Sequence, residues 1–514
     1  MITYISTTFK NNSGKPRIWI EGRKLLVAFN AGDKYRIDYN NETRVVELIA
    51  DPDGSQTVNK RTKNDSILPL IELREKKLEE LYEYGVRLTV KVKKGHVTFS
   101  VDAIDAGNKV RAEEFRQKIM AGEPLDKATA FTGGGIIDRA IHEGLKLGGI
   151  DSKVKLVIES EEMYLESFLR NQSDLLADDA IICNSKIEEI NFDDDDFNFT
   201  IDLFVCTLPC VGASKAGKSS LKLKTAEHHS SAGAAFFYAL NMVKKFKPVC
   251  FVIENVQDFL TTASYAVITS VLKNWGFSLS EKVLNGNEFA ALENRDRLCL
   301  VANLNQLKEF DFTNVIPLED KANSLREFIE DIPADDQMWR TFDYLKTKLV
   351  RDKAKGSGFA PTLYSGDEDK IITIRRTYHK AGSCDPYLIH PTKPELSRLF
   401  TPQEHAHFKT IPFWLVDGNS NTIQHELLGQ SGCYLQFMSV GLGLAVNYLL
   451  SAGKYASCLQ IKDSINVEMF IKLGKHARVI ERKGRGFILL TKAATEYLIS
   501  KGCELIPDNE AIAA

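Results

Sequence analysis

The side chain best suited to covalent chemistry is Cys210, which follows Pro209 at the end of the apolar segment IDLFVCTLPC. A thiol at the carboxyl end of a buried strand faces the edge where open α/β sheets bind their ligands, and its thiolate can act as a nucleophile. A lone cysteine in an apolar strand is more often a small buried hydrophobe, and we interpret Cys206 in that way. Cys210 is therefore a candidate nucleophile whose assignment depends on its neighbours.

Two further segments carry charged side chains at strand ends. Glu254 and Asn255 close the apolar run FVIENV, and a carboxylate there could bind or protonate a ring nitrogen. Arg295 and Arg297 lie two residues apart in ENRDRLCLVAN, so a strand would point both to one face, toward an acceptor such as a carbonyl or a phosphate. Taken alone, the carboxylate could equally be structural, and an R-x-R pair is more often solvated surface.

The segment from Phe131 through Thr132 to Gly133, Gly134 and Gly135 has the pattern of a cofactor-binding turn. It follows a short strand and precedes a helix, and its glycines allow a ligand to approach the backbone closely. More than 20 positions later, Glu159 ends the strand KLVIES, where folds of this kind bind a ribose hydroxyl. Together the two features favour a cofactor that contains adenosine.

A competing motif lies directly after Cys210. Residues 212–219, GASKAGKS, satisfy the P-loop pattern G-x-x-x-x-G-K-[ST], with Lys218 as its lysine. This pattern keeps a P-loop nucleotide hydrolase open as an alternative function. A catalytically inactive DNA-binding module is a third possibility, and the presence of Cys210, Glu254 and Arg297 argues against it.

The elements that must position these residues change character along the chain. Residues 1–122 read as short alternating strands and predict a β-rich accessory domain. Residues 123–302 alternate apolar strands with amphipathic helices, which predicts an α/β core on a parallel sheet. Residues 303–390 are rich in proline, glycine and charge and predict a smaller inserted domain. We expect the core to return over 391–454, and a basic hairpin and a helix to follow over 455–514.

Within the N-terminal region the pattern predicts a strand at 24–29, KLLVAF, and a helix at 70–85, LIELREKKLEELYEYG. At the other end, ARVIERKGRGFILL predicts the hairpin and TKAATEYLIS the helix.

Composition limits the class of protein. The chain has 514 residues, of which 44% are hydrophobic and 26% charged, enough for several cores in a globular protein. The formal net charge of -3 means that a DNA partner would need local basic segments. Nine cysteines without a C-x-x-C pair argue against a disulfide framework or a zinc ribbon. We see no signal peptide or membrane span, so we expect a cytoplasmic enzyme.

In this order and spacing, the segments resemble the cytosine-5 DNA methyltransferase family over about residues 123–452. FTGGG is similar to the family's F-x-G-x-G cofactor loop, which implies that Phe131 lies against the adenine, and Glu159 matches the family's ribose acid. Pro209-Cys210 matches its Pro-Cys nucleophile and Glu254-Asn255-Val256 its Glu-Asn-Val motif. Residues 293–297 match Q-x-R-x-R except that Glu293 replaces the glutamine.

Later segments extend the resemblance. Residues 398–412, RLFTPQEHAHFKTIP, are similar to the pattern R-x-L-T-x-R-E-x-A-R-x-Q-x-F-P. The Gly429-Gln430-Ser431 triplet resembles the Gly-Asn-Ser or Gly-Gln-Ser that lies beside the cofactor, although Gly432 then replaces the usual valine. Near Asn184, where the family has an acid for the adenine amino group, no acid matches. Residues 372–383, ITIRRTYHKAGS, look like part of the variable target-recognition region.

The resemblance implies an S-adenosylmethionine-dependent (Rossmann-like) α/β methyltransferase core with an inserted target-recognition domain, next to the N-terminal β-rich domain. It implies S-adenosylmethionine as methyl donor and double-stranded DNA as substrate, with the target cytosine flipped out of the helix. It assigns Cys210 to attack on carbon 6, Glu254 to N3, and Arg297 with Arg295 to O2. The Cys-Phe-Thr tripeptide of the family's tRNA-methylating branch is absent, which favours DNA.

Overall fold

A computed structural model of the chain describes residues 1–41, 43–63, 66–210, 225–228, 233–354, 360–461 and 467–500. The P-loop-like segment 212–219, with Lys218, lies outside the described residues. The chain divides into two compact units, Met1–Arg111 and Ala112–Ala514. The division falls within helix α2, Ala103–Ala121, whereas the sequence-based boundary was set at 122, after this helix.

The N-terminal unit is built from two antiparallel sheets, of orders β1-β9-β10-β5-β4-β6 and β2-β3-β8-β7. Alternating side chains such as Val46 and Leu48 of β5, and Val90 and Val92 of β9, are fully buried in its own hydrophobic core. The β-rich domain expected from the sequence is therefore present. Its strands are β1 Ile2–Thr8, β2 Lys10–Asn12, β3 Lys15–Glu21, β4 Lys34–Asn40, β5 Val45–Ala50, β6 Gln56–Thr57, β7 Asn59–Lys63, β8 Ser66–Leu73, β9 Arg87–Lys93 and β10 His96–Val101.

Two local predictions in this unit were wrong. Residues 70–85 do not form one helix, because β8 continues to Leu73 and the helix α1 covers only Leu78–Leu81. The alternation that buries Ile71 and Leu73 in the core outweighs the helix propensity of the charged residues that follow. Residues 24–29 do not form a strand either, because a 3-10 helix, Arg23–Val27, places Leu25 in the core.

The second unit contains a seven-stranded sheet of order β13-β12-β11-β14-β15-β17-β16. The first five strands in this order are parallel, and β17 pairs antiparallel with both β15 and the edge strand β16. The parallel α/β core predicted from the sequence is confirmed. The strands are β11 Leu125–Ala130, β12 Ser152–Ile158, β13 Leu176–Cys183, β14 Leu203–Thr207, β15 Cys250–Asn255, β16 Phe277–Asn285 and β17 Asp296–Leu304.

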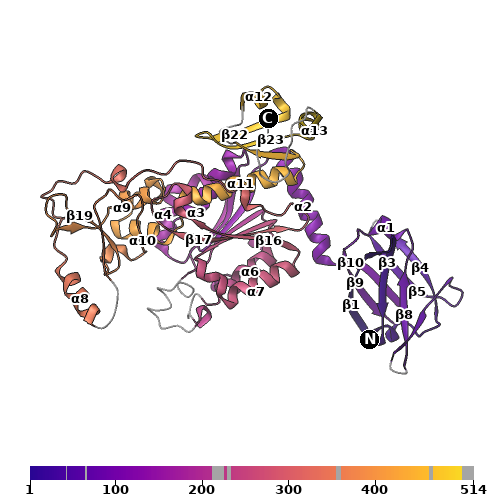
Figure 1. Cartoon of the computed structure of the whole chain (residues 1–514). Helices are drawn as coiled ribbons and strands as arrows, with labels where there is room; N and C mark the ends of the chain where they lie inside the picture. Colours follow the sequence, from indigo (N-terminus) through magenta and orange to yellow (C-terminus); the bar gives the residue numbers. More distant parts are fainter. Residues whose placement is uncertain are drawn as a thin grey trace. The chain divides into compact units, whose positions relative to one another are not determined.

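Helices cover both faces of this sheet: Figure 1 shows α6 and α7 on one face and α3 and α11 on the other. Helices α3 and α11 cross closely at glycines, since a Cβ on Gly144 would lie 2.1 Å from the Met438 carbonyl oxygen and one on Gly441 would lie 2.3 Å from that of Ile141. The helices are α3 Ile136–Leu147, α4 Glu162–Gln172, α6 Ala235–Phe246, α7 Ala263–Asn274, α8 Asp343–Ala354, α9 Pro402–Phe408, α10 Asn421–Gln430 and α11 Tyr434–Ser451.

Helix α11 is also, among the described residues, the helix that is long and apolar enough to cross a membrane. Its apolar window is 89% buried inside the protein, as expected for the core helix of an α/β domain.

Two smaller sheets follow. Strands β18 Thr362–Tyr364, β19 Pro386–Ile389 and β20 Ser397–Arg398 form a three-stranded sheet near a separate cluster that includes Trp339 and Tyr378. Near the C-terminus, β21 Ser457–Gln460, β22 Ala477–Arg482 and β23 Arg485–Leu490 form another, with α12 Val467–Ile471 and α13 Lys492–Ser500. The hairpin and helix predicted after residue 455 are thus confirmed.

Candidate active site

The glycine-rich turn joins β11 to α3 at the carboxyl edge of the parallel strands. Phe131, Gly133 and Gly135 have positive φ angles of 58°, 54° and 71°. At Gly135 only glycine fits, because a Cβ would lie 2.1 Å from the ring of Phe168. The turn therefore has the left-handed backbone and the close packing that the three glycines predict.

Glu159 lies beneath this turn, directly after β12. Its carboxylate accepts the backbone N–H of Gly133 at 2.6 Å and that of Glu161 at 2.9 Å. The side chain is 7% exposed, and this burial raises its pKa. The two cofactor motifs predicted from the sequence are thus in direct contact, and Glu159 fixes the backbone of the turn.

The end of α10 forms a wall of the same site, although it lies almost 300 residues later in the chain. A Cβ on Gly133 would lie 2.8 Å from Nε2 of Gln430, and one on Gly134 would lie 3.1 Å from Leu427. Ser431 follows, with its hydroxyl donating to the Gly432 carbonyl at 3.1 Å. The glycine backbone of the turn, the buried Glu159 carboxylate and the Gln430 amide lie close together here. Such a set of polar groups fits a cofactor that has hydroxyl and amino groups.

The replacement of valine by Gly432 has a packing explanation. A Cβ at this position would lie 2.6 Å from the ring of Phe437 and 3.0 Å from Ile137. A side chain would therefore clash with the start of α11 and with α3.

Cys210 lies three residues beyond the end of β14 and is half-buried. Its segment is tied on both sides: the Asn255 amide donates to the Leu208 carbonyl at 3.2 Å, and the Thr207 hydroxyl donates to the carbonyl of Phe131. Strand pairing also places Thr207 opposite Glu254. The Pro-Cys segment, the Glu-Asn-Val segment and the glycine turn therefore lie at one edge of the sheet.

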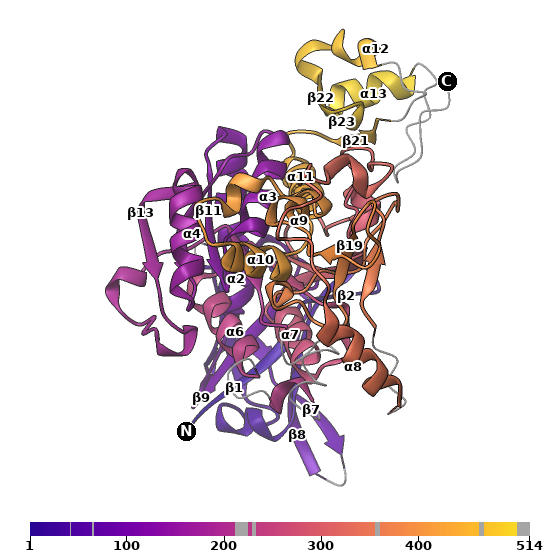
Figure 2. The same ribbon diagram turned by 90° about the vertical axis from the view of Figure 1, so that its left-hand side faces the viewer.

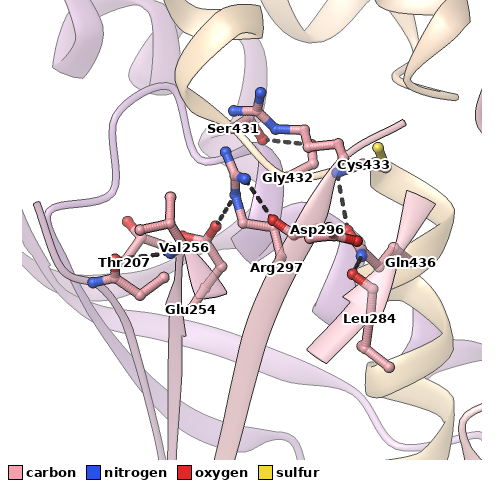
Figure 3. A network of polar contacts seen from close by, with 12 residues as sticks. Thr207, Glu254, Val256, Leu284, Asp296, Arg297, Ser431, Gly432, Cys433 and Gln436 are labelled. Atoms are coloured by element: carbon pink, nitrogen blue, oxygen red, sulfur yellow. Dashed lines mark hydrogen bonds and ion pairs between the residues drawn. The ribbon is translucent and has the colours of Figure 1, made fainter. Parts of the chain in front are cut away.

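Glu254 and Arg297 form a buried ion pair in which Nε of Arg297 lies 2.7 Å from Oε1 of Glu254, and Figure 3 shows the two side chains pointing toward one another from β15 and β17. The two side chains are 9% and 8% exposed. Burial raises the pKa of Glu254, and the charge of Arg297 is the largest influence that opposes it. A carboxyl group held in this way can donate or share a proton with a ring nitrogen.

Arg295 has a different environment from Arg297. Its guanidinium donates to Glu293 at 3.0 Å and to the Gly429 carbonyl at 2.7 Å, and it is 2% exposed. Both contacts are within the protein, so this arginine holds the end of α10. The glutamate that replaces the family's glutamine is thereby an ion-pair partner of the first arginine in its own motif.

Some polar side chains at Asn184 and near residue 375 form contacts within the protein. The Asn184 amide donates to the backbone carbonyl of Glu159 at 3.0 Å. Arg375 pairs with Asp385 at 2.6 Å, and Tyr378 is fully buried with its hydroxyl donating to Pro386. Arg376 and Lys380 remain exposed. Of the four residues that cluster in this sequence, two therefore build the fold.

Sequence reasoning missed Lys409, which stands where the pattern R-x-L-T-x-R-E-x-A-R-x-Q-x-F-P has its glutamine. The side chain is fully buried, and its ammonium donates to the carbonyls of Leu428 and Ser431. Burial is the largest influence on its pKa, followed by the charge of Arg295, and the pKa falls to about 7. A charged residue at a position where the family pattern is neutral was the available signal.

A mostly parallel sheet with a glycine turn, a buried acid and a half-buried thiol at one edge is typical of α/β enzymes that bind a nucleoside cofactor. The family model for C-5 cytosine-specific DNA methylase matches residues 158–431, more than half of the chain. The chain belongs to this family. It is a DNA cytosine-5 methyltransferase with S-adenosylmethionine as its methyl donor.

The chain is also similar to individual proteins. Type II methyltransferase M1.ScrFI of Lactococcus lactis subsp. cremoris is 26% identical over 290 residues, covering 54% of this chain and 69% of that protein. Type II methyltransferase M.SsoII of Shigella sonnei is 25% identical over 239 residues, covering 45% of this chain and 60% of that protein. The crystal structure of S. pombe Dnmt2 methyltransferase matches with a TM-score of 0.49 and 19% identity, over 63% of this chain and 99% of that chain.

Proposed function

We propose that the enzyme methylates cytosines flipped out of double-stranded DNA, and that Cys210 is its nucleophile. The observation that carries this proposal is the joining of three segments at one sheet edge: the Pro-Cys segment, the buried Glu254–Arg297 pair and the glycine turn above Glu159. A base stacked in a duplex could not reach this edge, so flipping is required. We expect the reaction to take place in the cytoplasm.

The proposed cofactor residues are Phe131, Gly133, Gly135 and Glu159, together with Pro209, Gln430 and Ser431. When bound there, S-adenosylmethionine supplies an electrophilic methyl group. Within this set, the Glu159 carboxylate accepts the Gly133 N–H and the Gln430 amide lies beside Gly133, so these three residues would hold one another in place for binding.

The proposed chemistry begins with addition of the Cys210 thiolate to carbon 6 of cytosine, which forms a C–S bond and moves electrons toward carbon 5. Glu254 shares its proton with N3 and so stabilises the charge that develops on the ring, and its raised pKa suits this role. Arg297 holds the Glu254 carboxyl in place and offers its remaining N–H groups to O2. After carbon 5 carries the methyl group, a base removes its proton and the C–S bond breaks, which releases the thiolate.

Arg295 was predicted to act with Arg297 at O2. We propose instead that it supports the end of α10, because its two terminal nitrogens donate to Glu293 and to the Gly429 carbonyl. We propose residues 303–390 as the target-recognition region. Most residues of the separate cluster around Trp339 and Tyr378, and strands β18 and β19 of the small sheet, lie within this range and support an inserted domain. Exposed Arg376 and Lys380 supply charges for phosphate contacts.

Bisulfite sequencing of DNA from cells that express the protein tests the proposed function. We expect protected cytosines within one short sequence context, absent from cells that carry the empty vector. A genome without any protected context, despite folded protein in the cells, would contradict methylation of duplex DNA by this enzyme.

A second experiment addresses the P-loop pattern at 212–219. We expect Lys218→Ala to leave S-adenosylmethionine affinity within about threefold of wild type, and we expect no hydrolysis of ATP by either protein, because the cofactor residues above account for nucleoside binding. Calorimetry with S-adenosylmethionine and with Mg-ATP measures both. Binding of Mg-ATP that depends on Lys218 would favour the nucleotide hydrolase instead.

A further inference from the structure

The end of α10 is held by two buried cations. Lys409 donates to the carbonyls of Leu428 and Ser431, and Arg295 donates to that of Gly429 at 2.7 Å. The last carbonyls of a helix lack partners within the helix and carry the negative end of its dipole, so they bind cations well. Both cations are buried, since Lys409 is 0% and Arg295 2% exposed.

This helix end bears directly on the proposed cofactor site. Gln430 lies between the carbonyls that the cations bind, and its amide lies against Gly133 of the glycine turn. Helix α10 packs against α9 and α4, which flank it in Figure 2. The backbone of the Lys409 segment is fixed as well, because its carbonyl accepts the Tyr434 N–H at 2.9 Å and the Thr410 hydroxyl accepts that of Leu435 at 3.0 Å.

The charge of Lys409 is balanced within the same cluster. Glu293 is fully buried, ion-paired with Arg295 at 3.0 Å, and its charge raises the pKa of Lys409. Both residues replace a glutamine of the family pattern, one with a negative and one with a positive charge. The two departures therefore leave the net charge of the buried site unchanged, whereas either alone would leave an uncompensated charge.

We propose that Lys409 is a positioning residue which, together with Arg295, clamps the end of α10 and so sets Gln430 against the cofactor, with Glu293 as its compensating charge. This inference rests on the proposed cofactor placement beside the glycine turn. Lys409 acts through the α10 backbone and through Gln430, and it takes no part in the transfer itself.

We expect the clamp to be sensitive to pH in the neutral range. A charged ammonium binds carbonyls more strongly than a neutral amine, and the pKa of Lys409 lies at about 7. Cofactor affinity should therefore be greatest below pH 7 and fall as the pH rises through that value. The charged and titratable groups that influence Lys409 are Arg295, Glu293 and Arg297 from β17 and the segment before it, Cys433 before α11, Glu254 of β15 and His405 of α9.

The test uses the full chain and measures S-adenosylmethionine affinity by calorimetry from pH 6 to 9, with a thermal melt of every variant. At pH 6.5 we expect K409Q and E293Q each to weaken binding roughly tenfold, and the double variant E293Q/K409Q to return to within about threefold of wild type. K409Q should lose the pH step near 7. E293Q, which keeps the lysine, should move that step to lower pH.

The matched control is K273Q, which removes an exposed lysine in the last turn of α7 and should leave both affinity and pH profile unchanged. A merely structural role would lower melting temperatures without moving the pH step. Losses that multiply in the double variant, or a pH step that persists in K409Q, would overturn the proposal. If K409Q fails to fold, the proposal is tested by whether the pH step of cofactor affinity moves to lower pH in E293Q. Wild type that does not bind S-adenosylmethionine at all would instead contradict the proposed cofactor site.

Discussion

Cys210→Ser is expected to abolish methyl transfer, by roughly 10³-fold or more, while DNA and cofactor binding stay within about threefold of wild type. A serine hydroxyl is close to the thiol in size, and Cys210 is half-buried beyond the end of β14, so the replacement leaves the fold intact. The hydroxyl pKa is too high for it to supply a nucleophile near neutral pH, whereas a thiol can ionise. Only the addition to carbon 6 should fail.

Transfer of a radiolabelled methyl group to duplex DNA measures the rate, and calorimetry measures cofactor binding in the same preparations. Cys183→Ser is a matched control, because Cys183 is also a half-buried cysteine at the carboxyl end of a strand, β13, of the same sheet. It should keep a rate near that of wild type. Substantial methylation by Cys210→Ser would show that another residue supplies the nucleophile.

The sequence predicted which segments meet at the candidate site better than it predicted some local structure. Glycines, acids and thiols at strand ends could be assigned to one site from the sequence. The carboxyl ends of parallel strands meet at the same edge of a sheet, independently of the conformation of the loops between them. This is why Glu159 could be linked to the turn at Gly133 before their 2.6 Å contact was known. Residues 70–85 were misread because charged residues with high helix propensity follow a strand, β8, whose partner β3 lies far away in sequence.

The partners of the arginines could not be predicted from spacing. Arg295 and Arg297 were expected to act together, yet one binds Glu293 and the Gly429 carbonyl while the other binds Glu254. Both arginines are buried and the Asp296 between them is exposed, so the two-residue spacing holds. Spacing does not specify which acceptor each guanidinium meets, because those acceptors come from other segments of the chain. Lys409 was missed for a related reason. Its acceptors are backbone carbonyls at the end of α10, and every residue has a carbonyl, so residue types do not indicate which carbonyls bind a cation.

DNA that carries 5-fluorocytosine at the target is expected to trap the enzyme as a covalent adduct, and the trap should require both Cys210 and S-adenosylmethionine. The proximity of the Pro-Cys segment to the glycine turn, joined through the Thr207 hydroxyl and the Phe131 carbonyl, motivates this expectation. In the normal reaction the C–S bond breaks when carbon 5 loses its proton to a base. Fluorine cannot leave carbon 5 as a positive ion, so elimination stalls with Cys210 still bound to carbon 6.

A band of protein-bound DNA that resists denaturant should appear on a gel with wild type and with Cys183→Ser in the presence of S-adenosylmethionine. It should be absent with Cys210→Ser, without cofactor, and with unmodified DNA. Glu254→Gln should form the adduct much more slowly, because an amide cannot share a proton with N3 and so stabilises the developing ring charge less well. If the substituted DNA gives no adduct under conditions in which unmodified DNA is methylated, then addition to carbon 6 is not part of the reaction, and the nucleophilic role proposed for Cys210 is wrong.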